Sequence, residues 1–99
     1  MPAYCLFDNL EVLDADALAE YARLVAPVVA AHGGRYVFLG APTEVLEGAS
    51  PLVFPVMIEF PTLEAAKEWY DSPEYAPLKA MRHAATRSSG VLLGMAPAS

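Results

Sequence analysis

The sequence predicts an α+β fold in which an antiparallel sheet carries helices on one face. Strand-like and helix-like segments follow one another as strand, helix, strand, strand, helix, strand over 99 residues, a length that fits one domain. Hydrophobic residues make up 56% of the chain and charged residues 18%, against usual shares of about 45–50% and about 25%. The predicted strands are apolar on both faces, whereas a sheet with one face in water alternates apolar and polar residues.

The first strand and the first helix are well marked. Residues 3–12, AYCLFDNLEV, alternate imperfectly and are predicted as a strand with largely apolar faces near its start. Residues 14–34 repeat apolar side chains at helical spacing and end in a Gly-Gly pair, which predicts a helix with a left-handed stop. Asp14 or Asp16 is expected to cap its first turn, and Pro27 is expected to kink it, because proline removes one backbone hydrogen bond.

The middle of the chain is predicted to contain further strands. Residues 35–40, RYVFLG, form a short strand, and residues 43–48, TEVLEG, are predicted as a second strand or as an extension of the sheet edge. The longest apolar run is PLVFPVMIEF at residues 51–60, and it is predicted as a strand. Pro55 is expected to mark its start or a bulge, because proline cannot donate a hydrogen bond to a neighbouring strand.

The last part of the chain is predicted as two helical segments and a final strand. Residues 61–71 form a second helix with a threonine N-cap, and residues 72–89 are predicted to restart as helix. Ser72 is expected to cap this segment and Pro73 to be its first helical residue, so the Ser-Pro step separates two helices. Residues 90–95, GVLLGM, are predicted as the last strand.

This order of elements is the ferredoxin-like βαββαβ arrangement. Both helices are then expected to pack on one face of the antiparallel sheet, which leaves the other face bare. Because the strands are apolar on both faces, the bare face is expected to meet a partner. A second copy of the same sheet is the simplest partner, so the sequence predicts a homodimer in which two sheets meet face to face.

The charge of the chain excludes several classes of partner. A net charge of −6 repels phosphate backbones, so we expect no nucleic-acid binding. No run of Lys and Arg indicates an anionic membrane surface, and no apolar stretch approaches the ~18 residues of a membrane span. The amino-terminal stretch has no signal-peptide pattern, and the single cysteine, Cys5, suits a reducing compartment. A cytoplasmic location is therefore expected.

The patterns that mark cofactors are missing from the sequence. Two distant histidines and one cysteine supply no metal-ligand spacing, so no metal is expected. No glycine-rich phosphate loop follows a strand, and no context for a nucleophilic serine or cysteine is present. We therefore expect no cofactor, and any chemistry would depend on the side chains of the chain itself.

Four sequence blocks, taken together in order, resemble the DUF1330 family of the dimeric α/β-barrel superfamily. They are GGRY at 33–36, VLEG at 45–48, EFP at 59–61 and WYDSPEY at 69–75, and the resemblance covers residues 2–94. It implies a single domain of that kind over residues 1–99, with the fold inferred above, and a homodimer. The wider superfamily includes cofactor-independent monooxygenases, muconolactone-type isomerases, polyketide cyclases and haem-degrading enzymes, so the resemblance implies no single reaction.

The chain also departs from the family pattern. Leu39 and Ala41 stand where family members often carry an arginine and paired glycines, and the last strand lacks the acidic residue that many members keep. These departures predict a pocket that is less polar here than in relatives that use those groups.

Three residues are candidates for catalysis, each with a structural alternative. His32 is a candidate acid or base at the end of the first helix, where it can equally interact with the helix dipole. Glu59 lies among apolar residues, so burial would raise its pKa unless a partner such as Arg35 or Arg82 pairs with it. Arg82 is a candidate anion-binding residue through its planar guanidinium group, or else part of a solvated face.

Aromatic and basic residues are candidates for ligand binding. Trp69, Tyr70 and Tyr75 would line a site for a flat ligand, or belong to the core, as aromatics at helical spacing usually do. His83 and Arg35 are candidate polar contacts. The remaining tyrosines near the core, Tyr4, Tyr21 and Tyr36, are expected to be packing residues whose hydroxyls reach a polar edge.

Two functions of different classes are consistent with these features. The first is a small cofactor-independent enzyme of the isomerase, cyclase or monooxygenase type, acting on a small apolar or carbonyl-bearing molecule held between sheet and helices. The second is a non-catalytic homodimer that binds a small molecule or a protein. A pocket with convergent polar groups favours the enzyme, and a solid interior favours the second function.

Overall fold

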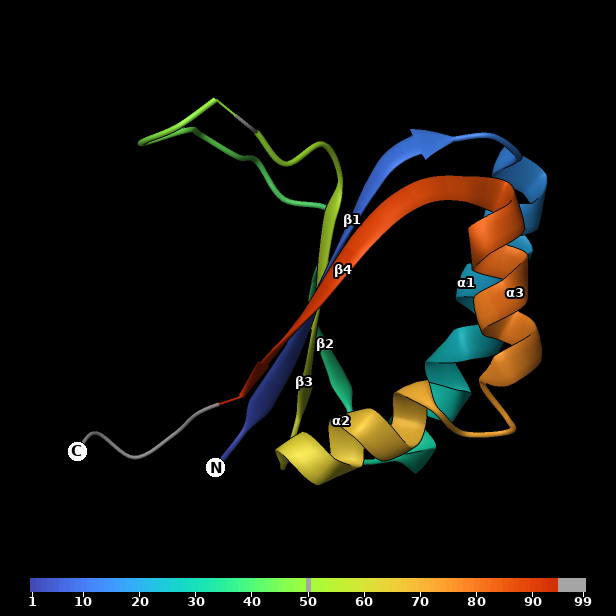
Figure 1. Ribbon diagram of the computed structural model, residues 1–99. Coiled ribbons are helices and arrows are strands. Elements are labelled where there is room, and N and C mark those ends of the chain that lie inside the picture. The colour runs from blue at the N-terminus through green and yellow to red at the C-terminus, as the bar shows by residue number, and fades with distance from the viewer. Residues whose placement is uncertain (50, 95–99) are drawn as a thin grey trace.

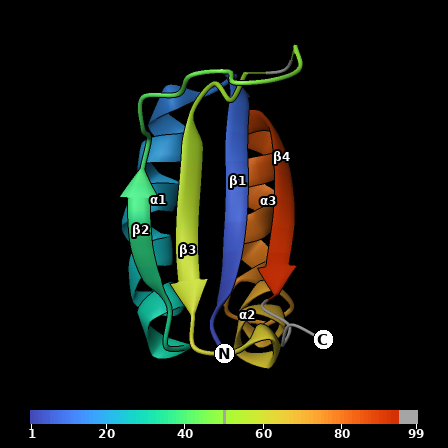
Figure 2. The same cartoon turned by 90° about the vertical axis from the view of Figure 1, so that its left-hand side faces the viewer.

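The computed structural model describes residues 1–49 and 51–94, and it confirms the α+β class (Figure 1). The elements are β1 (Ala3–Val12), α1 (Ala15–Ala31), β2 (Arg35–Leu39), β3 (Pro55–Phe60), α2 (Leu63–Tyr70), α3 (Ala76–Ala85) and β4 (Thr86–Gly94). The strands form one sheet in the order β2-β3-β1-β4, and every neighbouring pair is antiparallel. Figure 2 looks onto the sheet and shows all three helices behind it.

The register of the strands sorts their side chains between two faces. On the helix-covered face, Cys5 pairs with Ile58 on β3, and Phe7 pairs with Gly90 on β4. Phe60 lies on this face too, and all of these positions except Gly90 belong to the hydrophobic core. Because side chains alternate along a strand, the residues between them point to the opposite, open face of the sheet.

The first helix begins and ends much as its residues predict. Of the two candidate caps it is Asp14 that acts, and its Oδ1 accepts a hydrogen bond from the amide of Ala17 at 3.0 Å. Val25 and Val29 are buried against the sheet. Pro27 lies inside this one helix. Gly33 follows with a φ of +80°, the left-handed conformation that a glycine adopts without a steric penalty.

The predicted strand at 43–48 is absent, and β3 begins four residues later than the apolar run at 51–60. The late start of β3 is explained by an anchor on β1. The carboxylate of Asp8 accepts hydrogen bonds from the amides of Val53 at 3.0 Å and Phe54 at 2.7 Å. Amides bound to a carboxylate cannot pair with a neighbouring strand, so the ladder starts at Pro55, one of the two positions expected for this proline.

The last helix is shorter than predicted and the last strand is longer. Ser72 caps a turn, because its Oγ accepts from the amide of Tyr75 at 3.2 Å, but α3 begins only at Ala76. Pro73 therefore belongs to that turn and is not the first helical residue. Residues 86–89, for which the sequence predicts helix, pair instead with the polar end of β1 and extend β4 toward its start.

The aromatic core lies where the turn between α2 and α3 meets the sheet. Trp69 and Tyr75 are fully buried, with ring centroids 4.3 Å apart, and Phe60 lies 5.3 Å from Trp69. Ser72 closes this turn by donating from its Oγ to the carbonyl of Trp69 at 2.8 Å. The stretch that links the two helices is therefore a structural junction, as its Ser-Pro step predicts.

The open face of the sheet is not covered by any helix in the described part of the chain (Figure 2). Val91 and Leu93 of β4 are 54% and 47% exposed, and they pair with Leu6 and Tyr4 of β1. Its β1 and β4 side therefore carries apolar residues, as expected. None of the helices within 1–49 and 51–94 is long and apolar enough to cross a bilayer.

Candidate functional site

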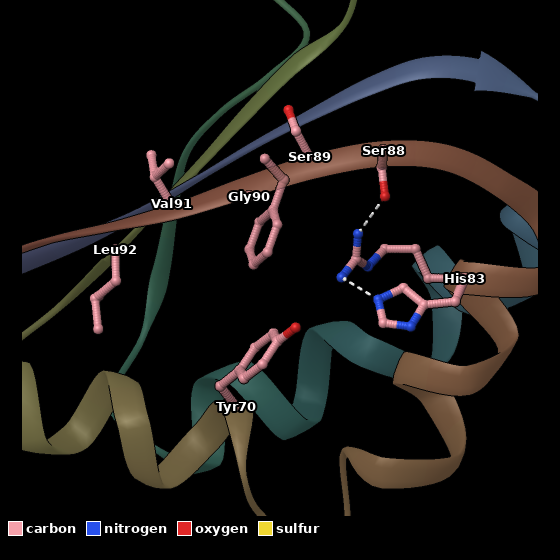
Figure 3. Close-up of a pocket in the computed structure, with 9 residues that line it drawn as sticks. Tyr70, His83, Ser88, Ser89, Gly90, Val91 and Leu92 are labelled. Atoms are coloured by element: carbon pink, nitrogen blue, oxygen red, sulfur yellow. Dashed lines mark hydrogen bonds between the residues drawn. The ribbon is translucent and has the colours of Figure 1, made fainter.

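Two cavities lie between the sheet and the helices. The larger has a volume of about 580 Å³ and lies among α1, α3 and the strands β1, β2 and β3. The smaller, of about 370 Å³, lies between β4 and the helices α2 and α3 (Figure 3). Phe7 and Arg82 line both cavities, so these two side chains form a common wall.

The larger cavity is mostly apolar. Small and branched residues of α1 face apolar residues of the sheet across it, and Phe54 of the following loop also lines it. Four lining side chains carry polar atoms, and they are Asn9, Tyr21, Tyr36 and Arg82. An apolar cavity with a few convergent polar groups is the usual form of a small-molecule site.

Arg82 reaches this wall because it shares the buried face of α3 with Leu78 and Ala85. It is 5% exposed. Its Nη1 donates to Ser88 Oγ at 2.7 Å, its Nε donates to Tyr75 Oη at 3.4 Å, and its guanidinium carbon lies 4.7 Å from the centre of the Phe7 ring. Within the described residues no carboxylate lies within 4.0 Å of it. A buried cation without an anionic partner is costly, so its position calls for an explanation.

A chain of hydroxyl groups leads from Arg82 into the larger cavity. Tyr75 Oη accepts from Arg82 and lies 2.9 Å from Tyr21 Oη, which lines the cavity. Burial raises the pKa of Tyr21, and the neighbouring Tyr75 raises it further. Burial, with a smaller contribution from Tyr75, raises the pKa of Tyr36 to about 12. Both cavity-lining hydroxyls are therefore protonated at neutral pH and can donate hydrogen bonds.

Asn9 adds a polar group to the same cavity. It is 8% exposed, and its Oδ1 has no hydrogen-bond partner among the residues that the structure describes. Buried polar atoms are nearly always paired, so each exception needs a reason. The other unpaired buried atom in the same part of the chain is Trp69 Nε1, which lines neither cavity. Asn9 therefore places a buried acceptor without a partner in the wall of the larger cavity.

The smaller cavity combines polar and apolar walls. Arg82 Nη2 lies 3.3 Å from His83 Nε2, and Ser88, which bonds to Nη1, closes the other side. Burial lowers the pKa of His83, and the charges of Arg82 and Lys79 lower it further. Gly90 lines the cavity beneath the Phe7 ring, and a Cβ at this position would lie 2.6 Å from Phe7 Cδ1.

The structure brings four of the sequence candidates together. Arg82 lines both cavities, and Tyr70 and His83 line the smaller one. Tyr75 lies behind the cavities and joins Arg82 to Tyr21. Trp69 belongs to the core and lines neither cavity.

The other three candidates lie away from both cavities. His32 follows the end of α1, where its Nδ1 lies 3.0 Å from the carbonyl oxygen of Val28. Glu59 and Arg35 pair on the open face, with 2.8 Å between Arg35 Nε and Glu59 Oε1. Hydrogen bonds from Arg35 and then from Tyr4 lower the pKa of Glu59, so this carboxylate lacks the raised pKa of a buried acid–base group.

Sequence reasoning misses two polar groups of the cavities and assigns two others to packing. Asn9 shares the buried face of the first strand with Cys5 and Phe7, and this register is a usable signal. Tyr21 and Tyr36 are expected from the sequence to be packing residues, yet both line the larger cavity. Ser88 falls within a predicted helix, so no pattern places it opposite Arg82.

Comparison with solved structures shows the same fold in several proteins. A protein of unknown function from Rhodopseudomonas palustris matches with a TM-score of 0.70 and 24% identity, over 98% of this chain and 84% of that one. A dimeric ferredoxin-like protein of unknown function from Thermobifida fusca matches with a TM-score of 0.63 and 11% identity, over 96% and 92% of the two chains.

A third solved structure belongs to a protein with a stated activity. It is a mutant of SnoaB, a cofactor-independent oxygenase from Streptomyces nogalater. It matches with a TM-score of 0.57 and 14% identity, over 98% of this chain and 94% of that one. At such low identity the likeness shows the ferredoxin-like fold alone. No curated protein matches the chain.

The family assignment comes from a match over most of the chain. The model described as "Domain of unknown function (DUF1330)" matches residues 2–95, a range that contains both cavities and the whole sheet. The chain belongs to the DUF1330 family.

Proposed function

We propose that the chain is a cofactor-independent enzyme acting on a small, mostly apolar molecule held in the larger cavity. The observation that carries this proposal is the convergence of Asn9, Tyr21 and Arg82 on an apolar space of about 580 Å³. Apolar walls hold the body of the molecule, and the polar groups fix the orientation of one oxygen function. Isomerisation, cyclisation and oxygenation all suit such a site.

The lining offers hydrogen-bond donors where negative charge would develop. Either hydroxyl can donate in the 2.9 Å contact between Tyr75 Oη and Tyr21 Oη, and we take Tyr75 as the donor because its oxygen already accepts from Arg82. The hydrogen of Tyr21 is then left for an oxygen of the ligand. Donors placed in a water-poor cavity stabilise an oxyanion strongly. A carbonyl-bearing molecule that forms an enolate or a phenolate is the substrate class that this arrangement favours.

The substrate itself must ionise readily, with its proton passing to water. No carboxylate and no histidine is present among the residues that line the larger cavity. Proton removal by a strong base of the chain is therefore not part of the proposed mechanism. Asn9 Oδ1 would accept a hydrogen bond from a hydroxyl of the substrate and so hold the molecule in register.

The absence of a base in that lining also favours the second candidate, a homodimer that binds a small molecule without converting it. In both cases we propose a single domain, a homodimer formed through the open sheet face, and a cytoplasmic location. The apolar exposure of Val91 and Leu93 supports the dimer. Burial raises the pKa of the Cys5 thiol to about 11, and a thiol of this kind is inert in a reducing compartment.

Native mass spectrometry of gently purified protein tests the proposal, because it reports the mass of the assembly and of any retained small molecule together. Ala22 lines the larger cavity from α1, so Ala22→Leu fills part of the space and is expected to abolish retention. Ala30→Leu on the same helix lines neither cavity and is the matched control. A retained molecule that survives Ala22→Leu would place binding elsewhere.

Conversion of the retained molecule separates the enzyme from the binding protein. Tyr21→Phe removes the proposed donor and is expected to slow turnover about 10²-fold or more, as loss of an oxyanion donor does. Tyr4→Phe removes a hydroxyl from the open face and is the matched control. A molecule that binds but is never altered would establish the non-catalytic function.

A further inference from the structure

We propose that the smaller cavity is a separate binding site for a small carboxylate with an apolar body. The cavity lies at the edge of the sheet, between β4 and the helices α2 and α3 (Figure 3). Apart from Phe7 and Arg82, its lining residues differ from those of the larger cavity. This inference therefore goes beyond the proposed function and does not depend on it.

The charge of Arg82 is unbalanced. A guanidinium group has five N–H donors, and Arg82 uses one on each nitrogen, toward Tyr75, Ser88 and His83. One N–H group remains on each terminal nitrogen. No carboxylate lines either cavity, and none within the described ranges pairs with Arg82. A bound anion would neutralise this buried cation and use its two remaining donors.

Arg82 is also fixed in place before any ligand binds. Ser88 Oγ holds one terminal nitrogen at 2.7 Å, and the Phe7 ring lies against the guanidinium plane at 4.7 Å. Nε2 of His83 faces a nitrogen that can only donate, so this histidine is neutral there and carries its hydrogen on Nδ1. An arginine held in place loses little conformational entropy on binding, which favours recognition of a planar group.

The walls of the cavity select a carboxylate over a phosphate. Leu92 is 38% exposed although its partner on β1, Cys5, belongs to the core. The exposed surface of Leu92 therefore contributes an apolar wall to the cavity, and the Tyr70 ring contributes another. Figure 3 shows the Tyr70 hydroxyl directed toward the side of the cavity where His83 lies. A single planar cation beside apolar walls fits an aryl or alkyl carboxylate, whereas a phosphate requires more charge and more donors.

Titration of the full chain with benzoate and with benzamide, followed by backbone amide NMR, tests the proposal. The two probes share a shape but differ in charge. Benzoate is expected to bind at least about tenfold more tightly, with saturable shifts at Ser89 and Gly90 of β4. Arg82→Met is expected to remove the preference for benzoate. Arg87→Met is the matched control, because Arg87 lies on β4, pairs with Glu11 and lines neither cavity.

Several outcomes would overturn the carboxylate site. These are equal binding of benzoate and benzamide, shifts confined to α1 at the larger cavity, and no saturable shift at millimolar benzoate. If Arg82→Met does not fold, Arg82→Lys keeps the charge without the fork and is expected to weaken benzoate about tenfold. Unchanged benzoate affinity in Arg82→Lys would also overturn the proposal. Retention of a molecule in the larger cavity is measured separately with Ala22→Leu, which alters that cavity alone, so failure of the carboxylate site is distinguishable from failure of the proposed function.

Discussion

Single atoms of a few residues decide what the two cavities can bind. Phe7 and Arg82 separate the cavities. Gly90 leaves space for the Phe7 ring, and His83 Nε2 lies beside the guanidinium group of Arg82. The surroundings of Gly90 and His83 lead to two predictions that do not depend on any ligand.

Gly90→Ala is expected to destabilise the protein, because the new Cβ would lie 2.6 Å from Phe7 Cδ1 and 2.8 Å from Cε1. The ring must move, and such overpacking costs about 1–3 kcal/mol of the free energy of unfolding. Urea unfolding measures the change. Gly94→Ala on the same strand is the control, since its new Cβ meets the flexible end of Leu63 at 3.1 Å. Equal stability of the two variants would show that the Phe7 ring yields freely.

His83 is expected to titrate below the usual histidine pKa of about 6.5. Burial disfavours its charged form, and Arg82 and Lys79 on α3 add repulsion. The unfolded chain then binds more protons between the two pKa values, so this contribution to stability falls as pH drops below about 6.5. Proton NMR titration measures the pKa directly. Lys79→Met is expected to raise it, and a wild-type value at or above 6.5 would contradict the assignment.

Among the elements, the loop between β2 and β3 shows how one side chain fixes a segment. Asp8 is 3% exposed, and its carboxylate holds the amides of Val53 and Phe54. Phe54 lines the larger cavity, so Asp8 also positions part of the proposed binding site.

Asp8→Ala is expected to leave these amides without an acceptor and to lower the free energy of unfolding by about 1–3 kcal/mol. Hydrogen exchange at Val53 and Phe54 should become faster than in the native protein. Asp8→Asn keeps one acceptor oxygen, so its free energy of unfolding is expected to lie between those of the native protein and Asp8→Ala. Unchanged exchange in Asp8→Ala would mean that other contacts hold this loop.

The elements that the sequence predicts well are those with their own local signals. β1 and α1 have an alternating pattern, an aspartate cap and a glycine stop, and they appear almost at the predicted bounds. The strand predicted from residue 51 begins only at Pro55, because Asp8 takes up the amides of Val53 and Phe54. The polar start of β4 has a local sequence that is typical of a helix. It forms a strand because it pairs with β1, which lies far away in the sequence. Long-range partners decide these boundaries, and local patterns do not contain them.

At the scale of the whole molecule, the fold leaves one face of the sheet without a covering helix in the described part of the chain. Its apolar residues are visible in the sequence as strands without alternation. The cavities are not visible in the sequence, because Asn9, Tyr21 and Arg82 come from three elements that only the fold brings together. Arg82 can be chosen as a candidate from its chemistry, whereas its lack of a carboxylate partner within the described residues is a fact of three-dimensional structure.

Val91→Glu is expected to convert the proposed dimer to a monomer, because it places a charge among the exposed apolar residues of β4 on the open face. Sedimentation at micromolar concentration measures the change. Leu13→Glu alters a residue that is 56% exposed and lies outside the sheet, so it is expected to leave the dimer intact. A wild-type monomer, or a dimer that persists in Val91→Glu, would remove the open face as the interface.

The common wall of Phe7 and Arg82 has a thermodynamic consequence. A molecule that shifts either side chain from one cavity changes the shape and charge met by a molecule in the other. The two binding equilibria then share a coupling free energy, and reciprocity requires the same factor in both directions. If a carboxylate at the edge of the sheet strengthens binding in the larger cavity, the larger cavity's occupant strengthens carboxylate binding equally. The protein would then respond to two small molecules jointly, within one subunit.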